Sequence, residues 1–414
     1  MGRADPASNR RKKRLSFPRR AIPLSLYVHI PWCLRKCPYC DFNSHALLAE
    51  GLPLSHHQAL PLEAPYLDAL CRDLEQELPF VAGREVATFF IGGGTPSLLS
   101  CAGLDRLLTS LRDRLPISAS AEVTLEANPG AVDVERFAGF KAAGVNRLSL
   151  GIQSFNDASL SRLGRIHNRA EAIAAFALAR RVGYDNINLD LMFGLPGQDL
   201  VGAKADLAAA LALAPEHISY YQLGIEPETA FYRRPPQLPD EETCLAMQAQ
   251  GVAMLAAAGF VQYEVSAYAQ PNRQCQHNRN YWEFGDYLGI GAGAHGKITG
   301  AEGVRRRAKY QNPRTYIEGI QANGAYLADE EWVSPSDLPV EFMLNALRLV
   351  EGVPSALYAE RTGLSLSRIS DKLALSRTRG WLDPREDRLV ATKTGRQFLN
   401  NLLELFLPDD ADQA

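Results

Sequence analysis

The stretch LSLYVHIPWCLRKCPYC, residues 24–40, joins an apolar, β-rich run to three cysteines, Cys33, Cys37 and Cys40. A 4Fe–4S cluster normally takes four cysteine thiolates, one for each iron. A CxxxCxxC loop supplies only three, so one iron stays open to a ligand that is not protein. The cationic neighbours Arg35 and Lys36 are expected to favour thiolate over thiol. The spacing therefore predicts a cluster with a reactive iron.

Zinc is the alternative metal for this loop. Zinc sites usually draw on two CxxC-type pairs or on added histidines at short spacing. His29 and His45 could complete such a site, and for His45 a ligand role and a structural role both stay open. The loop spacing favours the cluster over zinc.

From about residue 24 to residue 225 the chain alternates short β-rich runs with longer helical patterns. The predicted strands are 24–30, 86–91, 121–126, 146–152, 186–192 and 217–223. The predicted helices are 63–78, 102–114, 132–143, 170–182, 199–213 and 240–258. Nearly continuous apolar runs are typical of parallel strands buried on both faces. The order predicts an α/β fold built on an open, partial (β/α)6 barrel, whose ligands lie at the C-terminal ends of the strands.

The pattern changes toward the C-terminus. A further strand, 262–267, leads into a polar, aromatic and glycine-rich stretch, 268–298. Helical periodicity at 338–349, 354–361 and 366–378 then precedes a short apolar run at 389–391 and a final helix at 395–406. Helices followed by a small β wing predict a smaller, mostly helical, winged-helix-like domain. We therefore divide the chain into a basic disordered tail (1–22), a core (23–298) and a C-terminal domain (299–414).

Composition places the chain among ordinary globular proteins, with 46% hydrophobic and 22% charged residues in 414. No apolar run approaches the roughly 18 residues that a membrane-spanning helix needs. The basic N-terminus lacks the apolar segment of a secretory signal. Four of the seven cysteines are scattered, which fits a reducing compartment better than a disulfide framework. We therefore expect a cytoplasmic protein.

Positive charge is concentrated in the first 20 residues, which carry eight Lys and Arg against one Asp. Because the whole chain has a formal net charge of −3, the body beyond this +7 segment carries −10. The basic run is an alternative site for nucleic acid or an anionic membrane surface. A solvated, disordered tail is favoured by its composition. An acidic body argues against nucleic acid as a partner.

The segments LYVHIPW (26–32) and DFNSH (41–45), with the cysteines between them, resemble the radical S-adenosylmethionine (SAM) superfamily. Within it they resemble the branch that holds oxygen-independent coproporphyrinogen oxidases and the HemW family of heme chaperones. The resemblance runs from about residue 24 to 405. It implies a 4Fe–4S cluster on Cys33, Cys37 and Cys40, with the amino and carboxylate groups of SAM on the open iron.

A glycine-rich turn, Gly92-Gly93-Gly94-Thr95, follows the second predicted strand. Without Cβ atoms, its backbone can approach a ligand closely. Such turns join many strands to helices, so the turn alone says little. The resemblance matches Gly93, Gly94 and Thr95 to the element that holds the methionine part of SAM.

Polar residues stand at or near the ends of the next strands. Glu126 can accept hydrogen bonds from a ribose or an amino group, or cap the following helix. Asp190 interrupts an apolar strand and needs a partner, for which Arg165 is a candidate; that pairing would make both structural. The resemblance instead matches Glu126, Gln153, Arg165 and Asp190 to SAM contacts. It matches Tyr27 and Tyr39 to the same set more loosely.

The motif His277-Asn278-Arg279-Asn280-Tyr281-Trp282 is the second distinctive element. Imidazole is a common heme ligand, aromatic rings pack on porphyrin faces, and a cation can meet a propionate. A loop histidine beside an aromatic pair is more often structural. The resemblance makes the motif a family signature and His277 the candidate heme ligand, with Cys275 and His295 as further candidates.

Phe42 distinguishes this chain from the oxidases of the same branch. The oxidases of this branch read CxxxCxxCxC, and Phe42 occupies the position of their fourth cysteine. Together with the histidine motif this favours a chaperone that delivers heme to acceptor hemoproteins, membrane-bound respiratory enzymes among them. A coproporphyrinogen III oxidase-like radical SAM enzyme is the alternative. Whether SAM is cleaved, and whether the chain forms a homodimer, stay open.

Overall fold

The computed structural model describes residues 22–47, 60, 62–324 and 326–408. The basic tail expected at residues 1–22 lies outside this range except for Ile22.

A parallel sheet forms the main body, and its strands follow the predicted segments closely. Neighbouring strands in this part of the sheet all pair in parallel and are mostly buried. They are β1 (Leu24–Ile30), β4 (Val86–Gly93), β5 (Ile117–Ala127), β6 (Arg147–Gln153), β7 (Ile187–Phe193) and β8 (His217–Gln222). Because each is followed by a crossover helix, the described core is a partial (β/α)6 barrel.

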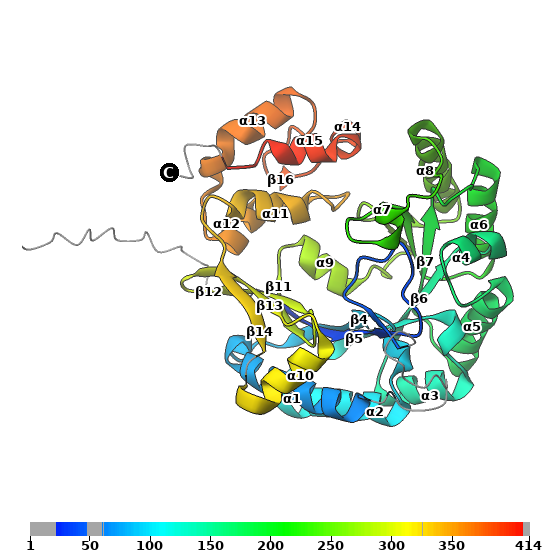
Figure 1. Ribbon diagram of the computed structural model, residues 1–414. Coiled ribbons are helices and arrows are strands. Elements are labelled where there is room, and N and C mark those ends of the chain that lie inside the picture. The colour runs from blue at the N-terminus through cyan, green and yellow to red at the C-terminus, as the bar shows by residue number, and fades with distance from the viewer. Residues whose placement is uncertain (1–21, 48–59, 61, 325, 409–414) are drawn as a thin grey trace, which may run out of the picture.

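The crossover helices cover the outside of the curved sheet (Figure 1). They are α1 (Glu63–Val81), α2 (Cys101–Arg114), α3 (Val134–Ala143), α5 (Arg169–Val182), α6 (Leu200–Ala212) and α8 (Glu241–Ala257). Shorter turns of helix lie between them: η1 (Pro96–Leu98), η2 (Pro129–Ala131), α4 (Asp157–Arg162) and α7 (Ala230–Arg233). Side-chain caps fix where several of the crossover helices begin, such as Ser100 for α2 and Asn168, with a full capping box, for α5.

The sheet extends at both edges beyond the six barrel strands. At one edge β11 (Asp286–Ile290) pairs in parallel with β1, followed by the antiparallel strands β12 (His295–Gly300), β13 (Gly303–Lys309) and β14 (Leu327–Trp332). The helix α10 (Pro313–Asn323) packs on α1. At the other edge, the strand expected at 262–267 is divided into β9 (Val261–Gln262) and β10 (Ala267–Ala269).

This extension was missed because its strands lack an apolar pattern. Residues 305–307 of β13 are all arginines, and two of them lie opposite acidic residues of β14: Arg306 is paired with Glu331 and Arg307 with Glu330. The sheet therefore continues past residue 298, and β12 itself spans the expected division at 298/299. The division into domains stays a prediction.

The C-terminal module is mostly helical, with a two-stranded wing. Its helices are α11 (Leu338–Ala346), α12 (Ala356–Thr362), η3 (Leu366–Ile369), α13 (Ser370–Thr378), α14 (Lys393–Gln397) and α15 (Leu399–Glu404). The short strands β15 (Val353–Pro354) and β16 (Arg388–Leu389) pair antiparallel. Its apolar core includes Phe342 and Tyr358 and is continuous with Phe284 and Val304 of the main body. The predicted fold class, a partial barrel followed by a winged-helix-like domain, is confirmed.

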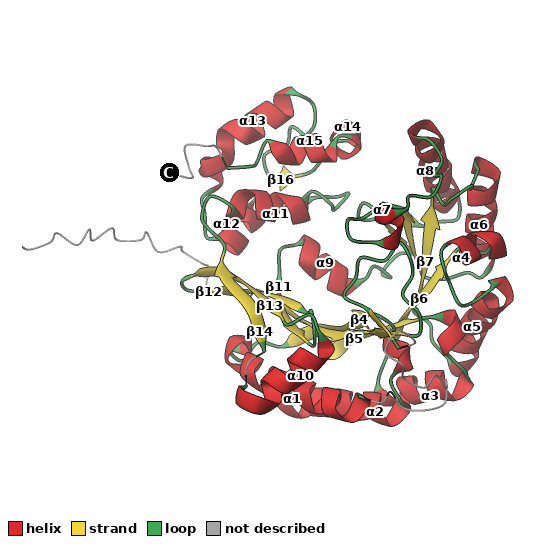
Figure 2. Cartoon of the chain, viewed as in Figure 1, coloured by secondary structure: helices red, strands yellow, loops and turns green. Residues whose placement is uncertain are grey.

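One short helix lies inside the curve of the sheet rather than outside it. This is α9 (Gln276–Trp282), which carries the histidine motif and contacts β1, β4, β11 and α11 (Figures 1 and 2). Among the described residues, no helix has both the length and the apolar character that crossing a membrane requires.

Candidate functional site

The cysteine loop follows directly after β1 and is closed by a short parallel pairing. The strands β2 (Trp32–Cys33) and β3 (His45–Ala46) pair, with His45 N donating to Pro31 O at 2.7 Å. Cys33, Cys37 and Cys40 are free thiols on the wall of a cavity of about 310 Å³. We call this cavity the thiol pocket. It lies where the loop meets the C-terminal ends of β4 to β7, as the barrel architecture predicts.

Each sulfur in the loop has a polar neighbour. Thr95 Oγ1 donates to Cys33 Sγ at 3.5 Å, and Arg165 Nη1 donates to Cys37 Sγ at 3.7 Å. Burial raises the pKa of Cys33 to about 11 and also raises that of Cys40. The charge of Lys36 lowers the pKa of Cys40, in the predicted direction, but burial is the larger effect on both thiols. A metal cation would supply the missing charge.

Contacts within the protein leave no room for side chains at the glycine turn. A Cβ on Gly93, which has φ +116°, would lie 2.6 Å from the His29 ring, and one on Gly94 would lie 2.6 Å from Trp32 O. Gly94 N and Thr95 N donate to Ile30 O and Trp32 O, both at 2.8 Å. The missing Cβ atoms thus let the turn reach the cysteine loop. Gly93, Gly94 and Thr95 also line the thiol pocket.

The two acids at the strand ends are buried near each other. Gly93 N donates to Glu126 Oε2 at 3.0 Å, and burial together with the charge of Asp190 raises the pKa of Glu126 to about 8. The carboxyl of Glu126 therefore holds a proton at neutral pH. Glu126 is not a helix cap, since Asn128 caps the next turn. Asp190 accepts from Asn188 Nδ2 at 2.8 Å and from Ser149 Oγ at 3.0 Å.

Gln153 and Arg165 each have an unused polar atom. Arg165 bonds Gly151 O at 2.7 Å as well as Cys37, so its alternative role as the hydrogen-bonded partner of Asp190 is not observed. Gln153 has φ +68°, which is uncommon for a residue with a side chain. Gln153 Oε1 and Arg165 Nε are buried without a hydrogen-bond partner among the described residues. Unsatisfied groups at a pocket wall suit a polar ligand.

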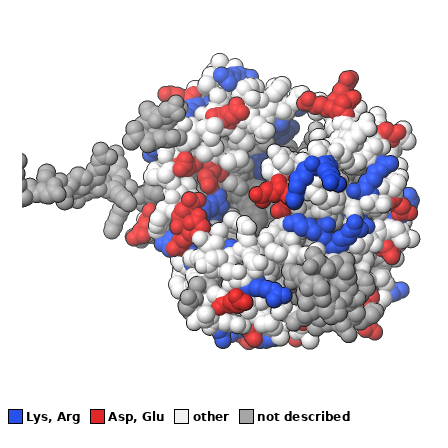
Figure 3. Space-filling view, in the orientation of Figure 1, with Lys and Arg blue, Asp and Glu red and all other residues white. Residues whose placement is uncertain are grey.

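A second, larger cavity adjoins the thiol pocket. It has a volume of about 730 Å³ and is lined mainly by the inner side of β11–β13, by α9 and by the cysteine loop. We call it the large cavity; the face seen in Figure 3 is hollowed near its centre. Four residues line both spaces: Asp41, Phe42, Gly93 and Glu126. Phe42 is 60% exposed, so its ring stands between them with little packing beneath it.

The structure brings most of the predicted site residues together. The thiol pocket is lined by Cys33, Cys37, Cys40, Tyr39, Gly93, Gly94, Thr95, Glu126, Gln153, Arg165 and Asp190. Tyr27 lines the large cavity instead, where its hydroxyl bonds His29 Nδ1 at 3.0 Å.

His277 lies apart from both spaces. Its ring is 1% exposed, and its Nδ1 and Nε2 are each 2.8 Å from a hydroxyl, of Thr88 and Tyr281 respectively. Thr88 lies five residues before Gly93 on β4, about 16 Å along an extended strand. Burial lowers the pKa of His277 to about 3. In this arrangement neither ring nitrogen is available to an iron, and the other motif candidate, Cys275, is fully buried with its thiol beside Glu122.

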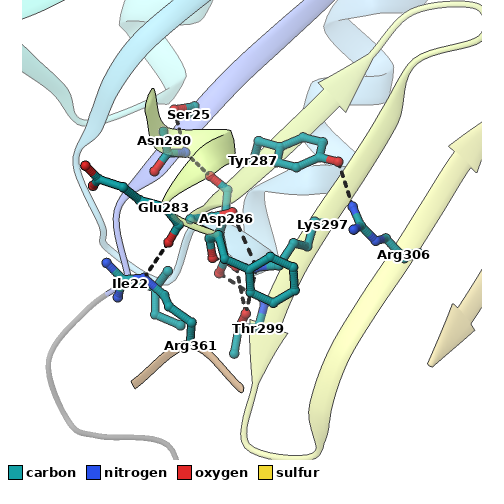
Figure 4. Close-up of polar contacts among 12 residues, drawn as sticks. Ile22, Ser25, Asn280, Glu283, Asp286, Tyr287, Lys297, Thr299, Arg306 and Arg361 are labelled. Atoms are coloured by element: carbon teal, nitrogen blue, oxygen red, sulfur yellow. Dashed lines mark hydrogen bonds and ion pairs between the residues drawn. The ribbon is translucent and has the colours of Figure 1, made fainter. Parts of the chain in front are cut away.

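The walls of the large cavity include residues that sequence reasoning did not single out. Tyr287 on β11 stacks edge-on against Tyr281, 4.5 Å between ring centres, and receives a 2.8 Å hydrogen bond from Arg306 on β13 (Figure 4). Below them Asp286 pairs with the buried Lys297 at 3.0 Å. Tyr287 and Arg306 carry no local signal, because only the pairing of β11 to β13 brings them to the cavity.

The geometry bears on the zinc alternative. No three potential ligands among the described residues converge on one point as a metal site. A single zinc needs such convergence, whereas each thiolate of a cluster binds a different iron. Asn43 engages both nearby histidines: its carbonyl lies 2.8 Å from His29 Nε2 and its Oδ1 lies 3.2 Å from His45 Nε2. Three thiols on one loop, beside histidines that already bond Asn43, fit the donor set of a cluster.

Comparison with known proteins agrees with this geometry. The family model "Radical SAM superfamily" matches residues 27–204, and "HemN C-terminal domain" matches residues 333–398. A coproporphyrinogen III oxidase, HemN of Escherichia coli, shares the fold with a TM-score of 0.78 at 24% identity, covering 93% of this chain and 90% of that one.

Relatives named "Heme chaperone HemW" match nearly end to end. The protein of Escherichia coli K12 is 49% identical over 94% of this chain and 99% of its own length. That of Bacillus subtilis is 35% identical over 92% of this chain and 99% of its own length. Identity at this level over whole chains makes this protein a member of the HemW family of heme chaperones, within the radical SAM superfamily.

Proposed function

We propose that this protein binds heme in the large cavity and transfers it to acceptor hemoproteins, while the thiol pocket holds a 4Fe–4S cluster with SAM at its open iron. The observation that carries the proposal is the pair of adjoining cavities of different character. One has three thiols and the strand-end polar residues, and the other has an aromatic wall and more than twice the volume. The names of the relatives, heme chaperones, indicate that the ligand is heme.

The residues of the thiol pocket suit these cofactors. Cys33, Cys37 and Cys40 would hold three irons, and the donors Thr95 and Arg165 would offset the charge of two thiolates. Arg165 Nε and Gln153 Oε1 would bind polar groups of SAM, and Asp190 would accept from its amino or hydroxyl groups. When bound, such a cluster would provide one-electron chemistry toward SAM, with Cys33, Cys37 and Cys40 as its protein ligands.

The large cavity suits a planar apolar ligand. Its volume falls in the range of about 300–1,000 Å³ that small-molecule sites occupy. Aromatic side chains of α9 and β11 would pack on a porphyrin face. Because Phe42 and Glu126 line both spaces, a ligand in one touches residues that contact a ligand in the other.

Anaerobic reconstitution followed by heme titration tests the proposal. We expect about four iron and four sulfide per chain, lost when the three loop cysteines are replaced by alanine. We also expect a Soret band on heme addition whose midpoint shifts with SAM, and passage of heme to an apo-hemoprotein. A zinc-loaded chain that binds no SAM contradicts the cluster, and a chain that binds no heme contradicts the chaperone.

The oxidase alternative is tested by the same preparation. Incubation with coproporphyrinogen III, SAM and a low-potential reductant should leave the substrate unchanged. Conversion of the substrate, abolished by Cys37→Ala, would overturn the chaperone assignment.

A further inference from the structure

The imidazoles of this chain differ in whether their ring nitrogens are already bonded. Of the described histidines, five have hydrogen bonds to the ring: His29, His45, His167, His217 and His277. The sixth, His295, makes no ring hydrogen bond to the described residues. A heme ligand must offer a free nitrogen lone pair to the iron. Among the histidines that the structure describes, His295 alone has no hydrogen bond from a described residue at either ring nitrogen.

His295 also lies in the right place. It begins β12, pairs with Ala308 of β13, and its side chain is exposed on the wall of the large cavity. Two glycines before it bring the loop close to neighbouring segments. A Cβ on Gly293 would lie 2.3 Å from Asn43 Nδ2, and one on Gly289 would lie 2.0 Å from His295 O. The backbone of His295 is thus held tightly while its ring faces open space.

The neighbouring wall is rigid and aromatic. Tyr281 is held by His277 at 2.8 Å, and Tyr287 is held by Arg306 at 2.8 Å. These hydroxyls are therefore already bonded, and their rings stay packed edge-on against each other. Lys36, at the cysteine-loop side of the same cavity, is exposed and donates to the carbonyl of Phe42 at 3.1 Å. A cation on the rim suits the propionates of a heme.

We propose that His295 supplies the axial ligand to heme iron in the large cavity, and that His277 positions Tyr281 in the wall. This inference rests on the proposed heme-binding function and names the ligand within it. The HNRNYW motif then contributes to the heme site through its aromatic residues, and its histidine acts as a positioning residue. Lys36 lies on the side where the propionates would leave the cavity.

Heme titration of the full chain with single-residue variants tests the inference. We expect His295→Ala to shift the Soret maximum and to weaken heme binding by about tenfold or more, since an iron–ligand bond is lost. Free imidazole added to this variant should restore the wild-type spectrum. Glu302→Ala, an exposed change on the turn after β12, is the matched control and should leave spectrum and affinity unchanged.

The same titration distinguishes a wrong ligand assignment from a wrong function. If the wild-type chain binds no heme, both the ligand assignment and the proposed heme-binding function fail. If it binds heme and His295→Ala keeps the Soret maximum and the affinity, only the ligand assignment fails. A Soret shift in His277→Ala that imidazole reverses would likewise overturn the assignment, whereas a lower unfolding temperature of His277→Ala with an unshifted Soret band supports it.

Discussion

Replacing Gly94 by alanine should separate the glycine turn from the cysteine loop. The new Cβ would lie 2.6 Å from Trp32 O, whereas ordinary contacts begin at 3.4 Å, so the two segments must part by about 0.8 Å. Two hydrogen bonds of 2.8 Å, from Gly94 N to Ile30 O and from Thr95 N to Trp32 O, would lengthen beyond useful range. Losing them costs about 1–3 kcal/mol, and overpacking costs about 1–3 kcal/mol more.

Thermal unfolding and iron content measure this effect together. Because Cys33 follows Trp32 directly, we expect Gly94→Ala to lower both the unfolding temperature and the iron and sulfide bound after anaerobic reconstitution. Gly300→Ala is the matched control, since a Cβ there meets nothing within 4 Å. Full iron content together with an unchanged unfolding temperature in Gly94→Ala would refute the reasoning from close contact.

Three further changes probe other parts of the site. Between about pH 4.5 and about 8 the carboxyl of Glu126 releases its proton in the unfolded chain but keeps it in the folded one, so the wild type should lose stability as the pH rises. In Glu126→Gln this pH-dependent loss should be absent, which unfolding temperatures measured across that range would show. Lys297→Met should cost about 1–3 kcal/mol in urea unfolding, because Asp286 loses one buried cation but keeps Arg84 at 2.7 Å, whereas Arg385→Met, at an exposed pair, should leave the urea midpoint nearly unchanged. Phe42→Ala should leave the unfolding temperature unchanged but weaken heme binding in a titration, since its exposed ring supports little besides a ligand.

Local patterns sufficed for the barrel and for most of the thiol pocket. Most barrel strands are apolar runs, and the crossover helices other than α1 begin at a side-chain cap, so most elements are encoded within their own segments. Parallel strands then bring their C-terminal ends to one edge, which is why Glu126, Gln153 and Asp190 could be expected near the cysteine loop. One contact of Asp190 was not predictable from local sequence: it accepts a hydrogen bond from Ser149, which becomes a neighbour only in the folded sheet.

The large cavity could not be predicted in the same way. Its walls come from β11 to β13, whose pairing with β1 joins residues more than 250 positions apart, such as Leu24 and Asp286. Nothing local to Tyr287 or Arg306 distinguishes them from ordinary strand residues. The contacts of the motif histidine could not be predicted for a related reason: the motif singles out His277, but only the folded chain places the hydroxyls of Thr88 and Tyr281 beside its ring nitrogens.

Position 42 shows why the cluster and the cargo are separable properties of this fold. Phe42 lies on the wall that the thiol pocket and the large cavity share, and its ring is exposed. A change of side chain there alters the boundary between the two spaces, whereas the start of the cysteine loop, at Cys33, is held by the β2–β3 pairing and the glycine turn. Phe42 places an apolar ring at this boundary. A cysteine at the same position would place a smaller thiol there. Under the proposed function, the residue two places beyond Cys40 would therefore affect what the larger space can hold, while the cysteine spacing would determine the metal group.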